Sequence, residues 1–121
     1  MALLKLIPNV FYADLAIGKH LFMDGLGFEL RYEDLASTQP LCILGKEAVQ
    51  VHLLQNATLA ALDRPELRLE TDDIQGLYSQ VKQRTPELLH PNGNQVVRKP
   101  WGLWEFALLD ASQVCVIVQQ P

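Results

Sequence analysis

The sequence has few basic residues and no long apolar run, and each shortage excludes a class of protein. Its 121 residues include 10 Lys and Arg against 14 Asp and Glu, for a formal net charge of −4. A chain of this sign has no electrostatic footprint for nucleic acid and lacks the basic face of a membrane-surface helix. No apolar stretch approaches the roughly 20 residues that span a bilayer. We therefore expect neither nucleic acid nor a membrane as a partner.

Cysteine is also scarce, with only Cys42 and Cys115 in the chain. Two cysteines fit a reducing compartment better than a disulfide scaffold, so we expect free thiols, and a single disulfide is the less favoured alternative. The apolar start, residues 1–7, has no cationic lead and no small-residue cleavage site, so it does not match a signal peptide. These features predict a cytoplasmic protein. Apolar residues make up 49% of the chain, enough for one packed domain spanning residues 1–121.

Hydrophobic periodicity predicts the same order of elements twice: one strand, one helix and three further strands. Asp14 and Asp73 are good N-caps, and each follows a predicted strand and opens a helix. The strands are expected at 3–12, 28–33, 41–44 and 49–54 in the first half, and at 67–71, 95–99, 104–109 and 114–119 in the second, where 88–90 is a possible additional short strand. A short helical turn is expected at 59–62, in the joint between the halves. The pattern predicts an α+β fold of two βαβββ units.

The duplication can be followed by residue offsets. The helix starts Asp14 and Asp73 lie 59 residues apart, whereas Gly45 and Asp110, in the closing hairpins, lie 65 apart. The second half should therefore hold six extra residues. Each half, about 1–56 and 65–121, is too small to be stable alone. We expect the halves to share one core or to exchange surfaces with a partner.

This duplication resembles the vicinal oxygen chelate superfamily, which includes glyoxalase I, extradiol dioxygenases and bleomycin resistance proteins. The segments that carry the resemblance are Asp14-Leu15, Leu26-Gly27-Phe28, Asp73-Ile74, Leu77-Tyr78, Pro100-Trp101-Gly102, Glu105-Phe106-Ala107-Leu108 and Asp110. The last of them are most similar to the bleomycin resistance branch. The resemblance implies a curved mixed sheet that forms a groove, completed when two chains pair as a homodimer.

Two departures from the family pattern concern the end of the chain. The turn Asp110-Ala111-Ser112-Gln113 contains neither glycine nor asparagine. It should therefore need no positive φ, or it should be strained. One additional residue separates Trp-Gly from Glu-Phe, which leaves open whether Trp101 and Trp104 face the groove or pack in a core or interface.

Enzymes of this superfamily hold a divalent metal at four equivalent strand positions, which the resemblance places here at Ile7, His52, Glu66 and Ile117. A catalytic metal site needs about three protein ligands and an open position. Two isoleucines cannot ligate, so we expect no metal and no catalytic residues. We favour His52 and Glu66 hydrogen-bonding each other or lining a polar groove. Zinc, nickel or iron held by these two residues remains the alternative.

Strand alternation extends these positions to a set of groove residues. They are Asn9, Phe11, Gln50, His52, Leu54, Glu66, Arg68, Trp101, Trp104, Cys115 and Ile117. This mixture suits an organic ligand with a flat or apolar body and a few hydrogen-bonding groups. Arg68 either holds a carboxylate or phosphate of the ligand, or pairs with Glu66 or Glu70 in its own strand.

Three functions follow from these patterns. The favoured one is a non-catalytic protein that binds a small aromatic or amphipathic compound, such as an antibiotic, in a groove at a homodimer interface. The second is a metal-dependent lyase, isomerase or dioxygenase of the same superfamily. The third is a structural or regulatory dimer without a ligand, which would require the groove to be filled by its own side chains.

Overall fold

The computed structural model describes residues 1–2 and 4–121, so Leu3, the expected start of the first strand, lies outside the described part. The elements of the first half are β1 (Asn9–Tyr12), α1 (Leu15–Lys19), the π-helix η1 (His20–Gly25), β2 (Glu29–Asp34), β3 (Leu41–Lys46) and β4 (Val49–Gln55). A joining helix, α2 (Ala57–Leu62), follows. The second half comprises β5 (Glu66–Glu70), α3 (Ile74–Arg84), the 3-10 helix η2 (Pro86–Leu88), β6 (Val97–Arg98), β7 (Trp104–Leu109) and β8 (Cys115–Gln120).

The strands form two four-stranded sheets of equivalent topology. Their orders are β1-β4-β3-β2 and β5-β8-β7-β6. In each sheet the first strand pairs in parallel with the last, and the remaining pairs are antiparallel. The predicted α+β fold of two βαβββ units is confirmed.

The strand registers locate the extra residues of the second half. Asn9 lies opposite His52, and Arg68 lies opposite Ile117. These pairs are related by the predicted offsets of 59 and 65 residues. The expected match of Gly45 with Asp110 is wrong by one residue, because Leu109 takes the position opposite Cys115 that Gly45 takes opposite Gln50. Five extra residues therefore precede β7, and one lies in the turn between β7 and β8.

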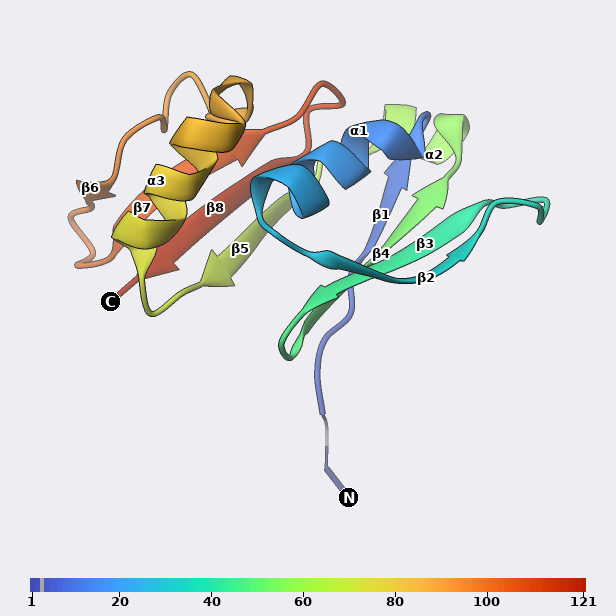
Figure 1. Ribbon diagram of the computed structural model, residues 1–121, viewed down its shortest axis with the longest axis horizontal. Coiled ribbons are helices and arrows are strands. Elements are labelled where there is room, and N and C mark those ends of the chain that lie inside the picture. The colour runs from blue at the N-terminus through green and yellow to red at the C-terminus, as the bar shows by residue number, and fades with distance from the viewer. Residues whose placement is uncertain (3) are drawn as a thin grey trace.

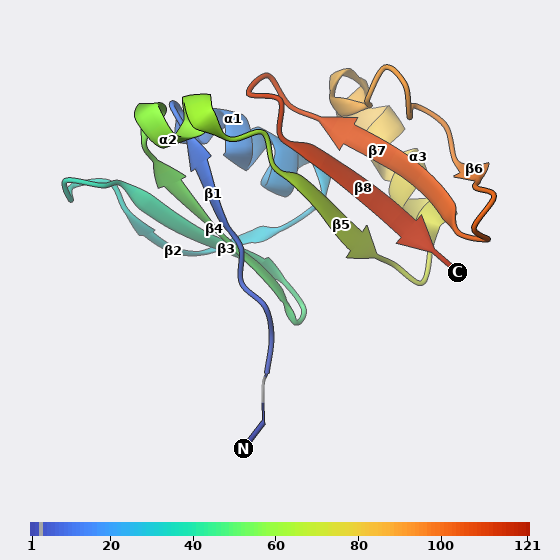
Figure 2. The same ribbon diagram turned by 180° about the vertical axis from the view of Figure 1, so that it is seen from behind.

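Helices α1 and α3 cover the same side of their sheets, in front of the strands in Figure 1 and behind them in Figure 2. Asp14 caps α1 as expected, with its Oδ1 accepting from the backbone N–H of Ala16 at 2.9 Å. Gly18 lets this helix lie directly on the sheet. A Cβ at Gly18 would stand 2.5 Å from the Tyr12 ring and 2.9 Å from Leu53.

The two halves share one core, which was one of the two outcomes expected. A single cluster of buried apolar residues includes Val10 and Leu53 from the first half and Phe106 and Val116 from the second. A hydrogen bond of 2.6 Å also crosses between the halves, from the buried Tyr12 hydroxyl to Asp110 Oδ2. The helices and the inner faces of both sheets enclose this core.

The first strand is shorter than predicted, because β1 begins at Asn9. Residues 4–6 extend away from the body of the molecule and are visible below it in both ribbon views. Apolar character alone predicted a strand here, but a strand also needs a neighbour to pair with. Leu4 and Leu6 are fully exposed as a result.

Two other local predictions concern the second half of the chain. Residues 88–90 do not form a strand: η2 ends at Leu88, and Leu89 makes only a single bridge with Leu108. In the turn after β7, Gln113 has a φ of 68°, so the strained alternative holds. Asp110 compensates by accepting hydrogen bonds from the backbone N–H groups of Ser112 and Val114 at 2.9 and 3.1 Å.

Candidate ligand-binding surface

Each sheet has an inner face packed on the helices and an open face on the other side. Burial alternates along β4: Val51 and Leu53 are buried, whereas His52 and Leu54 are half-buried. The strands β1, β5 and β8 alternate in the same way. The assignment of faces made from the sequence is therefore correct. The open faces carry the candidate site residues of these four strands.

The open face of the first sheet is largely apolar with a polar edge. Phe11 lies opposite Leu54, and Ile43 lies opposite His52. Lys5 Nζ donates to Gln50 Oε1 at 3.3 Å, which leaves the Gln50 amide N–H to donate to His52 Nε2 at 3.1 Å. That ring nitrogen is therefore an acceptor already in use. Asn9, across from His52, completes the edge.

The open face of the second sheet is more polar. Glu66 lies opposite Cys115, and Arg68 lies opposite Ile117. A pocket of about 240 Å³ lies over this face, and all of its lining residues belong to the second half: Glu66, His90, Asn92, Gly93, Gln95, Val97, Lys99, Glu105, Phe106, Ala107, Cys115 and Ile117. Burial, followed by the nearby Glu66 carboxylate, raises the pKa of the Cys115 thiol. The thiol is therefore protonated at neutral pH and is not an activated nucleophile.

The sequence left two alternatives for Arg68, an anchor for a ligand anion or an ion pair within its own strand. The structure shows neither a free guanidinium nor a within-strand pair. Its Nη1 donates to Glu105 Oε2 at 3.2 Å and to Gln119 Oε1 at 3.1 Å. The partners lie on the neighbouring strands β7 and β8. The within-strand pair with Glu66 or Glu70 was the wrong interpretation, because alternate residues along a strand stand farther apart than cross-strand neighbours.

The structure separates the two tryptophans. Trp101 lies on the open-face side, where its indole N–H donates to Glu105 Oε2 at 2.6 Å. Trp104 lies opposite Gln120 and beside Ile74, on the helix side of the sheet. The grouping of Trp104 with the groove residues is therefore corrected.

Two open-face residues were missed in the sequence. Tyr32 pairs with Ile43, next to His52, because the ladder shifts register between Leu30 and Tyr32. Glu105 pairs with Gln119, two residues beyond Ile117. In an antiparallel hairpin, paired residues lie on the same face, so the position of Ile117 is enough to place Glu105 on the open face. The register shift that places Tyr32 there has no clear sequence signal.

The residues do not fit the metal site of the superfamily's enzymes. His52 and Glu66 lie in different sheets, and the hydrogen bond made by the His52 ring is with Gln50 rather than with Glu66. Within residues 1–2 and 4–121, no group of three or more His, Cys, Asp or Glu side chains could hold a metal ion. A donor set of one imidazole and one carboxylate falls short of the three ligands that such a site needs.

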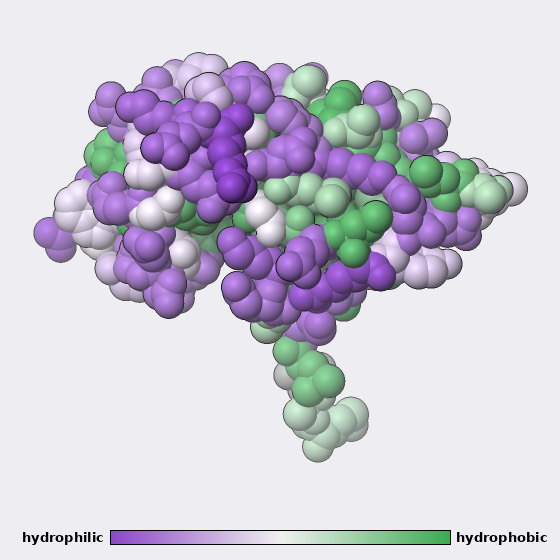
Figure 3. Space-filling view, in the orientation of Figure 1, coloured by the Kyte–Doolittle hydropathy of each residue, from purple (hydrophilic) through white to green (hydrophobic). Residues whose placement is uncertain are grey.

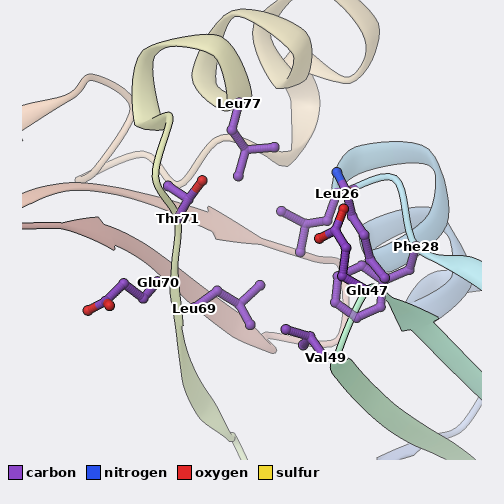
Figure 4. A pocket seen from close by; sticks show the side chains of 9 residues that line it. Leu26, Phe28, Glu47, Val49, Leu69, Glu70, Thr71 and Leu77 are labelled. Atoms are coloured by element: carbon purple, nitrogen blue, oxygen red, sulfur yellow. The ribbon is translucent and has the colours of Figure 1, made fainter.

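A separate apolar cavity lies between the two halves. Figure 4 shows Leu26, Phe28 and Val49 from the first half facing Leu69 and Leu77 from the second. A neighbouring cleft of about 500 Å³ shares Phe28, Val49 and Leu69. Neither half alone forms these hollows, so the sequence pattern of each half could not predict them.

Comparison with solved structures identifies the fold. A bleomycin-binding protein from bleomycin-producing Streptomyces verticillus, complexed with copper(II)-bleomycin, superimposes with a TM-score of 0.77 at 19% identity, covering 100% of this chain and 98% of that one. TnmS3, an antibiotic binding protein from Streptomyces sp. CB03234, gives 0.76 at 16% identity, with coverages of 100% and 98%. A glyoxalase/bleomycin resistance protein/dioxygenase superfamily member from Sphaerobacter thermophilus DSM 20745 gives 0.71 at 13% identity, with the same coverages.

The chain has the glyoxalase/bleomycin resistance protein/dioxygenase fold. No protein-family model and no curated protein sequence matches the chain. The likeness is therefore one of fold, at full length and at low identity, and it confirms the resemblance seen in the sequence. In the described part of the chain, no helix is long and apolar enough to cross a membrane.

Proposed function

We propose that this protein of the glyoxalase/bleomycin resistance fold binds a small organic molecule without transforming it. The observation that carries the proposal is the composition of the open faces. They present half-exposed apolar side chains, such as Phe11, Leu54 and Ile117, beside fixed hydrogen-bonding groups. The exposed indole of Trp101 is hydrogen-bonded to Glu105 on one of these faces. Such a surface recognises an aromatic or amphipathic compound by stacking, with polar groups fixing its orientation.

Antibiotics are the class of ligand that we put first. The neighbours named above include proteins described as binding bleomycin and as antibiotic-binding. Their identity to this chain is below 20%, so bleomycin itself is one candidate among planar and amphipathic antibiotics. The ligand would replace water on apolar surface that a single chain leaves exposed.

The groove should form between two chains. The pocket over the open face of the second sheet is lined by residues of the second half alone, so a ligand enclosed on both sides there needs a second surface to face it. The exposed apolar side chains Leu4 and Leu6 of the N-terminal segment also need a partner surface. Figure 3 shows this segment as a green, apolar extension from a mainly purple surface. A homodimer would cover it and complete the groove.

A non-catalytic role is supported by the side chains that chemistry would require. Isoleucines occupy two of the four positions where the superfamily's enzymes hold their metal, and the Cys115 thiol has a raised pKa. The free thiols of Cys42 and Cys115 support a reducing, cytoplasmic location. A metal-dependent reaction catalysed by this protein would refute the proposed non-catalytic role.

The test is a ligand screen on a Trp104→Phe variant, in which Trp101 is the remaining tryptophan. We expect saturable quenching of Trp101 fluorescence by one or more planar or amphipathic antibiotics, and no conversion of the bound compound. Elemental analysis of untagged protein supplies the control. A stoichiometric metal that is lost on His52→Ala would replace binding by metal-dependent catalysis.

A further inference from the structure

Glu105 is a buried carboxylate on the open face of the second sheet. The residue is only 5% exposed, although it sits in a polar pocket beside Cys115 and Ile117. A buried charge is costly unless hydrogen-bond donors satisfy it. The buried carboxylate of Glu105 therefore restrains the side chains that donate hydrogen bonds to it.

Both donors are side chains of the candidate groove. Glu105 Oε2 accepts from Trp101 Nε1 at 2.6 Å and from Arg68 Nη1 at 3.2 Å. Trp101 is 61% exposed, and the side chain of Arg68 is 45% exposed. The buried Glu105 carboxylate thus accepts hydrogen bonds from two side chains, Trp101 and Arg68, that are exposed to solvent.

Further bonds extend this arrangement across three strands. Arg68 Nη1 also donates to Gln119 Oε1 at 3.1 Å, and Gln119 Nε2 donates to Glu70 Oε1 at 3.4 Å. Arg68 belongs to β5, Gln119 to β8 and Glu105 to β7. The guanidinium is therefore held through Nη1, and its charge is partly compensated by Glu105 within the protein.

In the loop that carries Trp101, the backbone is fixed and the side-chain rotation of the indole is the main remaining degree of freedom. Its backbone is closed by hydrogen bonds from Lys99 N to Leu103 O at 2.8 Å and from Gly102 N to Lys99 O at 2.9 Å. Gly102 has a φ of 95°, which a glycine adopts without strain. With the backbone fixed, the bond to Glu105 is what restricts the rotation of the exposed ring.

We propose that Glu105 is a positioning residue: its buried carboxylate orients the indole of Trp101 for stacking and occupies the guanidinium of Arg68. The binding role rests on the function proposed above, whereas the orientation of the indole does not. A ring held in its binding orientation loses less entropy when a ligand stacks on it. Glu105 thereby contributes to affinity without touching the ligand.

The first readout is the indole N–H of Trp101, observed by NMR in the Trp104→Phe background. We expect a single downfield resonance that exchanges slowly with water in the parent protein. Glu105→Leu should return it to the position and exchange rate of a free indole. Glu105→Gln keeps an oxygen acceptor and should retain most of the protection. Glu70→Gln is the matched control and should change nothing, because among the described residues this carboxylate accepts a single side-chain hydrogen bond, the long one from Gln119.

An indole N–H that exchanges freely in the parent protein would overturn the proposal without any variant at Glu105, so misfolding of a variant cannot obscure the result.

The second readout is the affinity of a compound found in the screen. We expect Glu105→Leu to weaken it by up to about tenfold, the cost of immobilising one otherwise rotating side chain on binding, while Glu105→Gln retains most of it. Equal losses for Glu105→Leu and Glu70→Gln would overturn the positioning role. If no compound binds while the indole is protected, the proposed function fails and the orientation by Glu105 stands.

Discussion

The hydrogen bond between Tyr12 and Asp110 joins the two halves inside their common core, and Tyr12→Phe removes it with almost no change of shape. Tyr12 is 0% exposed, and its hydroxyl lies 2.6 Å from Asp110 Oδ2. A hydrogen bond to a buried charged group contributes about 1.5–3 kcal/mol. We expect the free energy of unfolding to fall by about 2 kcal/mol at neutral pH. In urea, with a slope of about 1–3 kcal/mol/M, the midpoint should fall by about 1 M.

The loss should depend on pH in a definite direction. Burial raises the pKa of the Asp110 carboxyl, while the bonds from Tyr12, Val114 and Ser112 oppose the rise. A raised folded-state pKa gives stability that is present below the unfolded value, about 3.9, and is lost as pH rises through the folded value. Removing the Tyr12 donor raises that pKa further, so the variant is penalised most where Asp110 is ionised. The difference between parent and variant should therefore shrink on acidification.

The assay is urea unfolding at several pH values, with Tyr78→Phe as the matched control. The Tyr78 hydroxyl donates to the backbone oxygen of Asn94 at 2.7 Å in an exposed position, so its loss should cost less than about 1 kcal/mol and show no such pH dependence. Equal effects of the two substitutions, or a Tyr12→Phe penalty that grows in acid, would refute the reasoning.

Two further predictions concern the contacts of α1 and η1. Gly18→Ala should destabilise the protein by about 1–3 kcal/mol, because the added methyl group would overlap the ring of the buried Tyr12; an unchanged thermal midpoint would show that the helix can shift at no cost. His20 bonds Asp24 through Nδ1 at 2.9 Å and Glu87 through Nε2 at 2.8 Å, and these bonds raise its pKa, the one from Asp24 most. The stability it contributes is present below its unfolded pKa, about 6.5, and is lost as pH rises through the folded value, so His20→Gln should lower the thermal midpoint more at pH 6 than at pH 9.

The sequence predicted what depends on local pattern and on duplication. Alternation along β4 and β8 assigned the two faces of each sheet, and the aspartate N-caps located both helices. Parity along β7 and β8 also places Glu105 on the open face, although this residue was not among the predicted groove residues. Trp104 was grouped with the groove residues while its facing was left open, and its pairing with Gln120 places it on the helix side.

What the sequence could not predict depends on contacts between distant segments. The partners of Arg68 lie 37 and 51 residues away, on strands whose register is set by the whole sheet. The start of β1 at Asn9 depends on how far the neighbouring strand β4 extends, since residues 4–6 have strand-like composition but are not paired in either sheet. The apolar cleft between the halves likewise arises from their packing rather than from either pattern.

The central claim is that an organic molecule binds, without a metal, between two copies of this chain. Native mass spectrometry of the untagged protein with a compound from the screen tests it most directly. We predict a dimer that carries one ligand for each of its two grooves, with no metal in the complex and with the ligand lost when the dimer dissociates. A monomer that retains the ligand, or a dimer that carries stoichiometric metal, would contradict the account.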